Sequence, residues 1–170
     1  MPEYPYNFGL ALGGPGGVIE KDTLRMMVRS DKLLYGLGRA LHTNKPPAMI
    51  LQLTDTWITD FKRSDDIVDG TGSKKEHSVV ATLVVATNYK FDQINPTAVV
   101  AYDPTYKGAL FVPFVDWLFG DHWRLHTELQ FYFPMGTQTD PVTGNGALDT
   151  HGFGTLANQN QANVRLTYQF

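Results

Sequence analysis

The last nine residues of the chain read Ala162-Asn163-Val164-Arg165-Leu166-Thr167-Tyr168-Gln169-Phe170. The even-numbered positions are apolar or aromatic, and the odd-numbered positions are polar or charged. Side chains of a β-strand point alternately to opposite faces, so this pattern predicts a strand with one apolar and one polar face. Such a strand fits the wall of a transmembrane barrel, where the apolar face meets lipid. It also fits an ordinary half-buried strand.

Further stretches of the chain share this two-residue period or a strand-like composition, and they predict six more strands, at residues 23–29, 49–61, 77–91, 97–103, 109–119 and 123–133. Residues 31–41 fit either a continuation of the first strand or a short amphipathic helix. The connections on the side of the C-terminus are predicted to be short, at 42–46, 92–95 and 120–122. On the opposite side they are long at 62–76 and 134–161 and brief at 104–107. Short turns on one side and longer loops on the other are typical of outer-membrane barrels.

The composition of the 170-residue chain excludes several classes of protein. A net charge of −3 argues against a nucleic-acid binder, and the absence of cysteine excludes a disulfide scaffold, a zinc-thiolate site and a cysteine nucleophile. No stretch approaches the roughly 18 to 20 apolar residues of a membrane-spanning helix. A barrel is compatible with the mean hydropathy of −0.22, because only alternate residues of its strands face lipid.

These patterns predict an all-β fold, an antiparallel transmembrane β-barrel of which residues 1–170 form a C-terminal segment of about seven strands. Residues 1–21 are expected to be an N-terminal loop or partial strand, and residues 22–170 to hold the barrel strands. Seven strands leave two open edges, and the candidate eighth strand at residues 4–12 is short and interrupted by Pro5. The edges are therefore expected to pair with N-terminal barrel strands or with another chain. A small complete eight-stranded structural or adhesion barrel and a soluble lipid-binding barrel are the alternatives.

The alternation also predicts which side chains face the lumen. The polar set comprises Arg124, His126, Glu128, Gln130, Asn163 and Arg165. Within this set, the cluster of Arg124, His126 and Glu128 is interpreted as a solvated barrel wall in preference to a site that grips a plug or an anionic solute. An apolar set, Leu110, Val112 and Phe114, is unexpected in an open aqueous pore. It would pack against an inserted segment or contact an apolar substrate such as a lipid, although strands buried on both faces of a soluble sandwich would look the same.

A search for catalytic chemistry is negative. His77 and Ser78 are adjacent in a predicted strand, so they point to opposite faces and cannot form a nucleophile–base pair. The carboxylates of Asp65, Asp66 and Asp69 lack the spacing of a calcium-binding EF-hand loop, and a solvated acidic loop is the better interpretation. We therefore expect no enzyme activity, no cofactor and no metal site.

A set of short strings occurs in a characteristic order along residues 22–170: Asp22-Thr23-Leu24-Arg25, Arg29-Ser30-Asp31-Lys32, Thr43-Asn44-Lys45-Pro46, Ala101-Tyr102-Asp103, Gly120-Asp121-His122-Trp123-Arg124 and Arg165-Leu166-Thr167-Tyr168-Gln169-Phe170. By their order and spacing, these strings resemble the C-terminal region of the domain-of-unknown-function family thirteen-oh-two. Members of that family are large outer-membrane β-barrel proteins of Gram-negative bacteria, several times longer than this chain.

The resemblance implies a location in the cell outer membrane and a conduit that passes a hydrophobic or amphiphilic molecule together with an inner-membrane exporter. It implies no catalytic residue. The expected partners are outer-membrane lipid and the barrel assembly machinery, and no nucleic acid. Tyr168 and Phe170 end the apolar row of the last strand, and this ending resembles the C-terminal signal that the assembly machinery reads.

Overall fold

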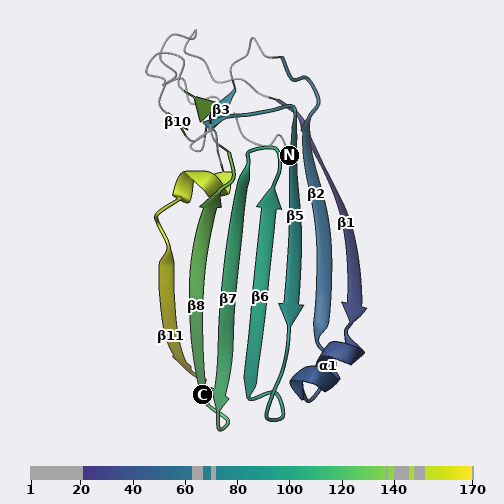
Figure 1. Ribbon diagram of the computed structural model, residues 1–170, viewed down its shortest axis with the longest axis vertical. Coiled ribbons are helices and arrows are strands. Elements are labelled where there is room, and N and C mark those ends of the chain that lie inside the picture. The colour runs from purple at the N-terminus through teal and green to yellow at the C-terminus, as the bar shows by residue number, and fades with distance from the viewer. Residues whose placement is uncertain are drawn as a thin grey trace.

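The computed structural model describes residues 21–62, 67–69, 72–136, 138–139, 146–147 and 152–169. One antiparallel sheet of seven strands dominates it (Figure 1). Its strands, given in their order across the sheet, are β1 (Thr23–Leu33), β2 (Ala48–Ile58), β5 (His77–Ala86), β6 (Ile94–Asp103), β7 (Gly108–Phe119), β8 (Trp123–Pro134) and β11 (Gln161–Tyr168). The predicted all-β class and the seven antiparallel strands are confirmed.

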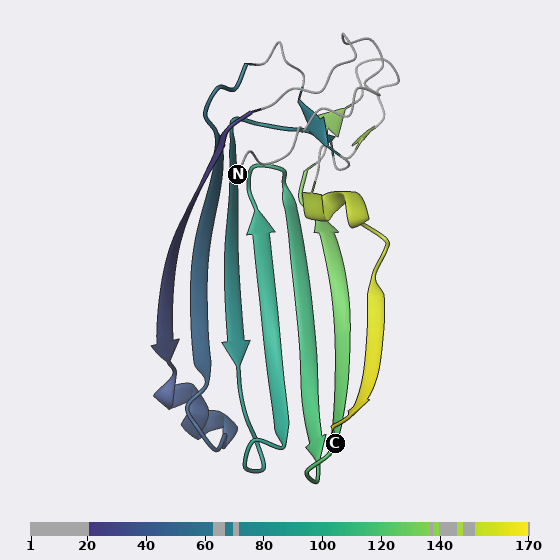
Figure 2. The ribbon, with the colours of Figure 1, turned by 180° about the vertical axis from the view of Figure 1, so that it is seen from behind.

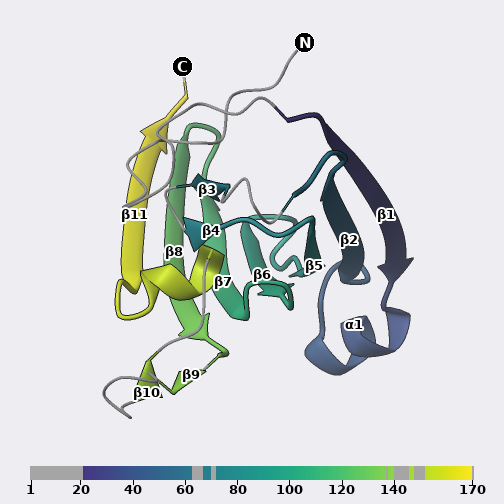
Figure 3. The same cartoon turned by 90° about the horizontal axis from the view of Figure 1, so that it is seen from above.

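The sheet is an open, curved wall with β1 and β11 at its two edges (Figure 3). Within the part of the chain that the structure describes, these two strands do not pair with each other. The expectation that seven strands leave two open edges is confirmed. The candidate eighth strand at residues 4–12 lies outside the described residues.

The two ends of the sheet differ in their connections (Figure 2). One end, which we call the loop end, carries two short hairpins and a 3₁₀ helix: β3 (Val68–Asp69) with β4 (Gly72–Ser73), β9 (Gln138–Thr139) with β10 (Gly146–Ala147), and η2 (Gly152–Leu156). The other end, the turn end, carries the helix α1 (Tyr35–Leu41) and the last residues of β11. The long connection predicted over 134–161 contains η2, which packs against β7 and β8.

Both interpretations of residues 31–41 are partly right. β1 continues to Leu33, and α1 follows it. The helix ends at His42, which has a left-handed backbone with a φ of 54°. Gly38 lies so close to the next turn that a Cβ on it would be 3.0 Å from Cδ of Pro47. Because the connection from β1 to β2 includes α1, it is longer than the short turn predicted at 42–46.

The strand predicted over 77–91 ends early, at Ala86. A turn follows it, in which Lys90, Phe91 and Asp92 all have positive φ angles of 49°, 56° and 67°. Side-chain amides stabilise this turn: Asn88 Nδ2 donates to Asp92 Oδ1 at 2.7 Å, and Asn95 Nδ2 donates to the Asp92 carbonyl at 2.7 Å. Asn and Asp favour such turns because their short side chains bond to the nearby backbone. This turn chemistry overrides the strand preference of the aromatic residues around it.

The hydrophobic core of the described residues is very small. Its buried apolar residues are Ile58, Ile67, Ala101 and Tyr106. None of the helices in these residues has the length and apolar composition needed to cross a bilayer. Most of the exposed large apolar side chains of the sheet lie on one face, and this distribution defines the candidate site.

Candidate functional site

The strand register divides the sheet into two faces. Residues paired directly across neighbouring strands share a face, and Phe114 pairs with Glu128, which pairs with Asn163. We call this face the inner face and the opposite one the outer face. Because of the alternation along each strand, all nine side chains predicted to face the lumen lie on the inner face: Leu110, Val112, Phe114, Arg124, His126, Glu128, Gln130, Asn163 and Arg165.

The inner face of β7 and β8 carries a charged triplet near the turn end. Asp116 Oδ1 accepts hydrogen bonds from Arg124 Nε at 3.1 Å and bonds to His126 Nδ1 at 2.9 Å. The side chains of Asp116 and His126 are only 14% and 16% exposed, so little water competes for these contacts. The carboxylate of Asp116 thus orients both basic groups.

The contacts continue from this triplet toward the loop end. His126 Nε2 lies 3.6 Å from Glu128 Oε2, and Gln130 Nε2 donates to Glu128 Oε1 at 2.6 Å. Tyr132 in turn donates its hydroxyl to Gln130 Oε1 at 2.7 Å, and Asn163 of β11 donates to Glu128 Oε1 at 3.2 Å. We call the connected set from Arg124 to Tyr132, with Asp116 and Asn163, the polar ladder. It is a hydrogen-bonded wall of polar and charged side chains.

Of the predicted polar residues, Arg165 alone has no bond within the ladder in the described residues. It lies opposite His126 in the register and is exposed. Asp116 was missing from the predicted set, although it holds the ladder together at its turn end. The signal for it was present, because Asp116 shares the parity of Phe114 within the predicted strand 109–119.

An apolar stripe crosses the inner face beside the ladder. Val84 of β5 pairs with Val99 of β6, which pairs with Val112 of β7, and Ala101 pairs with Leu110 in a neighbouring row. We call this set, together with Phe114, the apolar stripe. Phe114 joins it to the ladder, because its ring centroid lies 5.3 Å from that of His126. The inner face therefore offers polar and apolar surfaces side by side.

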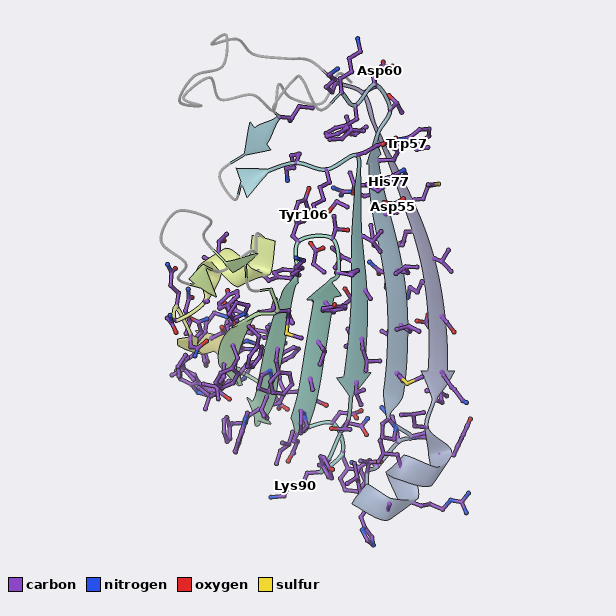
Figure 4. The ribbon with its side chains drawn as sticks, turned by 45° about the horizontal axis from the view of Figure 1, so that its top comes forward. Asp55, Trp57, Asp60, His77, Lys90 and Tyr106 are labelled. Carbon is purple, nitrogen blue, oxygen red and sulfur yellow. The ribbon has the colours of Figure 1, made fainter. Side chains whose placement is uncertain are left out.

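The outer face is apolar over its full width. Its most exposed side chains include Val28, Leu51, Leu53, Leu129, Val164 and Leu166, with Val164 73% exposed. A polar exception lies near the loop end, where His77 Nδ1 bonds to Asp55 Oδ2 at 2.9 Å and the His77 ring stacks on Trp57 with centroids 5.7 Å apart (Figure 4).

Aromatic side chains gather at both ends of the outer face. At the turn end they are Trp117, Phe119, Trp123 and Tyr168, and at the loop end they are Trp57, Tyr102, Phe131 and Phe133. The pair closest to the C-terminus is tight, with the ring centroids of Trp123 and Tyr168 4.8 Å apart. Aliphatic residues fill the band between the two rows.

Three comparisons with known proteins bear on identity. No protein-family model, curated protein or solved structure matches the chain. The resemblance to family thirteen-oh-two therefore stays a prediction that depends on the order of its motifs.

Of the predicted assembly signal, Tyr168 is placed by the structure as the last residue of β11. Phe170 lies outside the described residues, as do the acidic residues Asp65 and Asp66. The described residues contain no group of three or more His, Asp or Glu side chains that could hold a metal ion.

Proposed function

We propose that this chain forms part of the wall of an outer-membrane β-barrel that passes a hydrophobic or amphiphilic molecule. The observation that carries the proposal is the inverted polarity of the sheet. Its outer face exposes large apolar side chains, whereas its inner face carries the polar ladder. An apolar face that extends over seven strands would promote aggregation in water. In a membrane, lipid would cover this face without an energetic cost.

The height of the apolar band supports this assignment. On β8 the outer face runs from Trp123 to Phe133, and the ten residue-to-residue steps between them correspond to about 34 Å of strand. A tilt of about 40° reduces this length to about 26 Å, close to the apolar band of roughly 25 Å in outer-membrane barrels. The aromatic rows at both ends have the position of interfacial girdles.

The open edges require further strands in this setting. Unpaired backbone N–H and C=O groups in hydrocarbon cost several kcal/mol each, so β1 and β11 need partners there. We propose that strands of a longer polypeptide, or of another chain, complete the barrel. The alternative of a small barrel closed by this chain alone loses support from the open sheet. A soluble lipid-binding barrel would place its apolar face inward, opposite to the observed arrangement.

The inner face supports an amphiphilic cargo. An aqueous pore needs a continuous polar wall, but Val84, Val99 and Val112 form an apolar row across the middle of this one. Such a row would contact the hydrocarbon part of a cargo, while the ladder would contact its polar part. The family resemblance implies that an inner-membrane exporter delivers the cargo to this barrel.

The proposal can be tested by two measurements on cells that express the full protein. Membrane fractionation should recover the chain with the outer membrane, and extraction with alkaline carbonate should leave it there. Uptake or release of an amphiphilic fluorescent dye should fall when Val112→Glu interrupts the stripe, while Val115→Leu on the outer face should leave it unchanged. Recovery of the chain in the soluble fraction would contradict the membrane assignment. Equal dye movement in both variants would contradict the conduit.

A further inference from the structure

A cavity of about 420 Å³ lies on the inner face at the loop end, apart from the polar ladder. Side chains of β1, β2 and β5 form its floor, and Ile67 and Lys74 of the loop between β2 and β5 complete it. Ile67 is only 3% exposed, so the loop folds down onto the sheet at this point. The strands and the folded loop together therefore form the walls of the cavity.

The charged side chains that line this cavity are all basic: Lys21, Arg25 and Lys74. Arg25 Nε donates to Thr56 Oγ1 at 3.4 Å, and Lys21 Nζ donates to the carbonyl of Asp60 at 2.6 Å. No carboxylate side chain is part of the described lining. The guanidinium of Arg25 is bonded to the neutral hydroxyl of Thr56, so its positive charge favours an anion at this point of the cavity.

Hydroxyl groups supply further donors. Thr54, Thr56 and Thr82 line the floor, and each can donate one hydrogen bond to an oxyanion. The register holds them in place, because Thr56 pairs with Arg25 and Thr82 pairs with Gln52. Hydrogen bonds from charged and neutral donors together suit a carboxylate or a phosphate.

The loop above the cavity is held by specific contacts. The backbone N–H of Lys74 donates to the carbonyl of Ile67 at 2.7 Å. Its neighbour Lys75 donates its backbone N–H to the Tyr106 hydroxyl at 3.0 Å and its Nζ to the Thr105 carbonyl at 2.6 Å. Figure 4 shows Tyr106 at the β6–β7 turn, facing this loop. These contacts hold the backbone of Lys74 beside the cavity, and the Lys74 Nζ lies 5.7 Å from the centroid of the Tyr106 ring.

The cavity adjoins the apolar stripe. Val80 belongs to its lining, and Val84 of the stripe lies four residues further along the same face of β5. The row of Val84, Val99 and Val112 then crosses two more strands, each about 4.8 Å from the last. Thr82 of the cavity floor lies between these two valines, so a ligand with an anionic head in the cavity would meet the apolar stripe directly beyond Thr82.

We infer that this cavity binds the oxyanion head, carboxylate or phosphate, of an amphiphile whose hydrocarbon tail lies on the apolar stripe. The inference rests on the proposed function, and it specifies in addition that the head group of the cargo is negatively charged. Arg25 is the central contact, because it projects from β1 directly opposite the hydroxyl of Thr56.

The test is isothermal titration of the full protein, purified from membranes in a non-ionic detergent, with dodecanoate, dodecyl phosphate and the neutral dodecanol. At least one of the two anions should bind about tenfold or more tightly than dodecanol, and Arg25→Gln should remove that preference. The anion that shows the preference identifies the head group as carboxylate or phosphate. Arg29→Gln is the matched control: Arg29 lies on the same face of β1 but outside the cavity, paired with Asp31 at 2.8 Å.

Equal affinity for dodecanol and both anions would overturn the inference. An equal loss of the anion preference in the Arg25 and Arg29 variants would also overturn it. Inorganic phosphate serves as a further probe, and binding as tight as that of dodecyl phosphate would refute a role for the tail. These failures would leave the membrane assignment intact, because that assignment depends on fractionation and carbonate extraction of the same protein.

Discussion

Asp116 and His126 lie directly opposite each other in the β7–β8 pair and are joined by a hydrogen bond of 2.9 Å between Oδ1 and Nδ1. Arg124 binds the same carboxylate oxygen through its terminal nitrogen at 3.0 Å. One acidic group of β7 therefore holds two basic groups of the neighbouring strand β8. The pairing makes Asp116 the residue on which the turn end of the ladder depends.

Replacing Asp116 by Asn should destabilise the folded protein by about 1.5 to 3 kcal/mol, because a neutral amide weakens two hydrogen bonds that involve charged groups. The free energy of unfolding, measured by urea titration in lipid vesicles, gives the value. Asp121→Asn in the exposed turn after β7 is the control and should cost little. Equal losses in both variants would show that the contacts of Asp116 contribute nothing specific.

The two faces of β8 should respond differently to a new charge. Leu129→Arg places a cation on the outer face, where Leu129 is 45% exposed, and near the bilayer midplane this costs about 2 to 4 kcal/mol. Gln130→Arg places the same group on the inner face beside Glu128 and should cost far less. The same unfolding measurement compares them. A larger loss for Gln130→Arg would reverse the assignment of the faces.

Phe170→Asp should block assembly into the outer membrane while synthesis continues, because it removes the aromatic residue that ends the apolar alternation of the sequence from Ala162 onward. Heat-dependent migration on gels distinguishes the assembled barrel from the unassembled chain. Gln169→Asp makes the same change one position earlier, on the polar parity, and should assemble normally. A heat-modifiable barrel at normal levels in the Phe170 variant would remove the proposed signal.

The two ends of the sheet should face opposite sides of the membrane. A protease site inserted between Gly146 and Ala147 at the loop end should be cut from outside intact cells. A site inserted after Lys90, in the turn between β5 and β6, should be cut only after the outer membrane is opened. Cleavage in the opposite order would invert the proposed orientation.

Alternation along the chain was sufficient to predict most of the sheet. The strands predicted at 109–119 and 123–133 extend by a single residue in the structure, and the polar residues assigned to one face do share it. The prediction failed where local turn chemistry decided the outcome, as in the turn around Asp92. The two-residue alternation alone cannot show that the side chains of Asn88 and Asn95 form hydrogen bonds with Asp92.

The cavity could not have been predicted in the same way. Arg25 and Lys74 come from distant parts of the sequence, and they meet only because the register of three strands and the fold of a loop bring them together. Each is an ordinary basic residue in its own stretch of sequence. A site built from such residues becomes visible only when the tertiary arrangement is known.

The order of strands across the sheet is also their order along the chain. Every pairing therefore joins two strands that follow one another in the sheet order, so each contact closes a shorter loop than a pairing that skipped a strand would. The sheet can grow one strand at a time, and no strand has to be inserted between two that have already paired. β1 and β11 stand at the two ends of this order, and each has a neighbouring strand on one side only in the described residues.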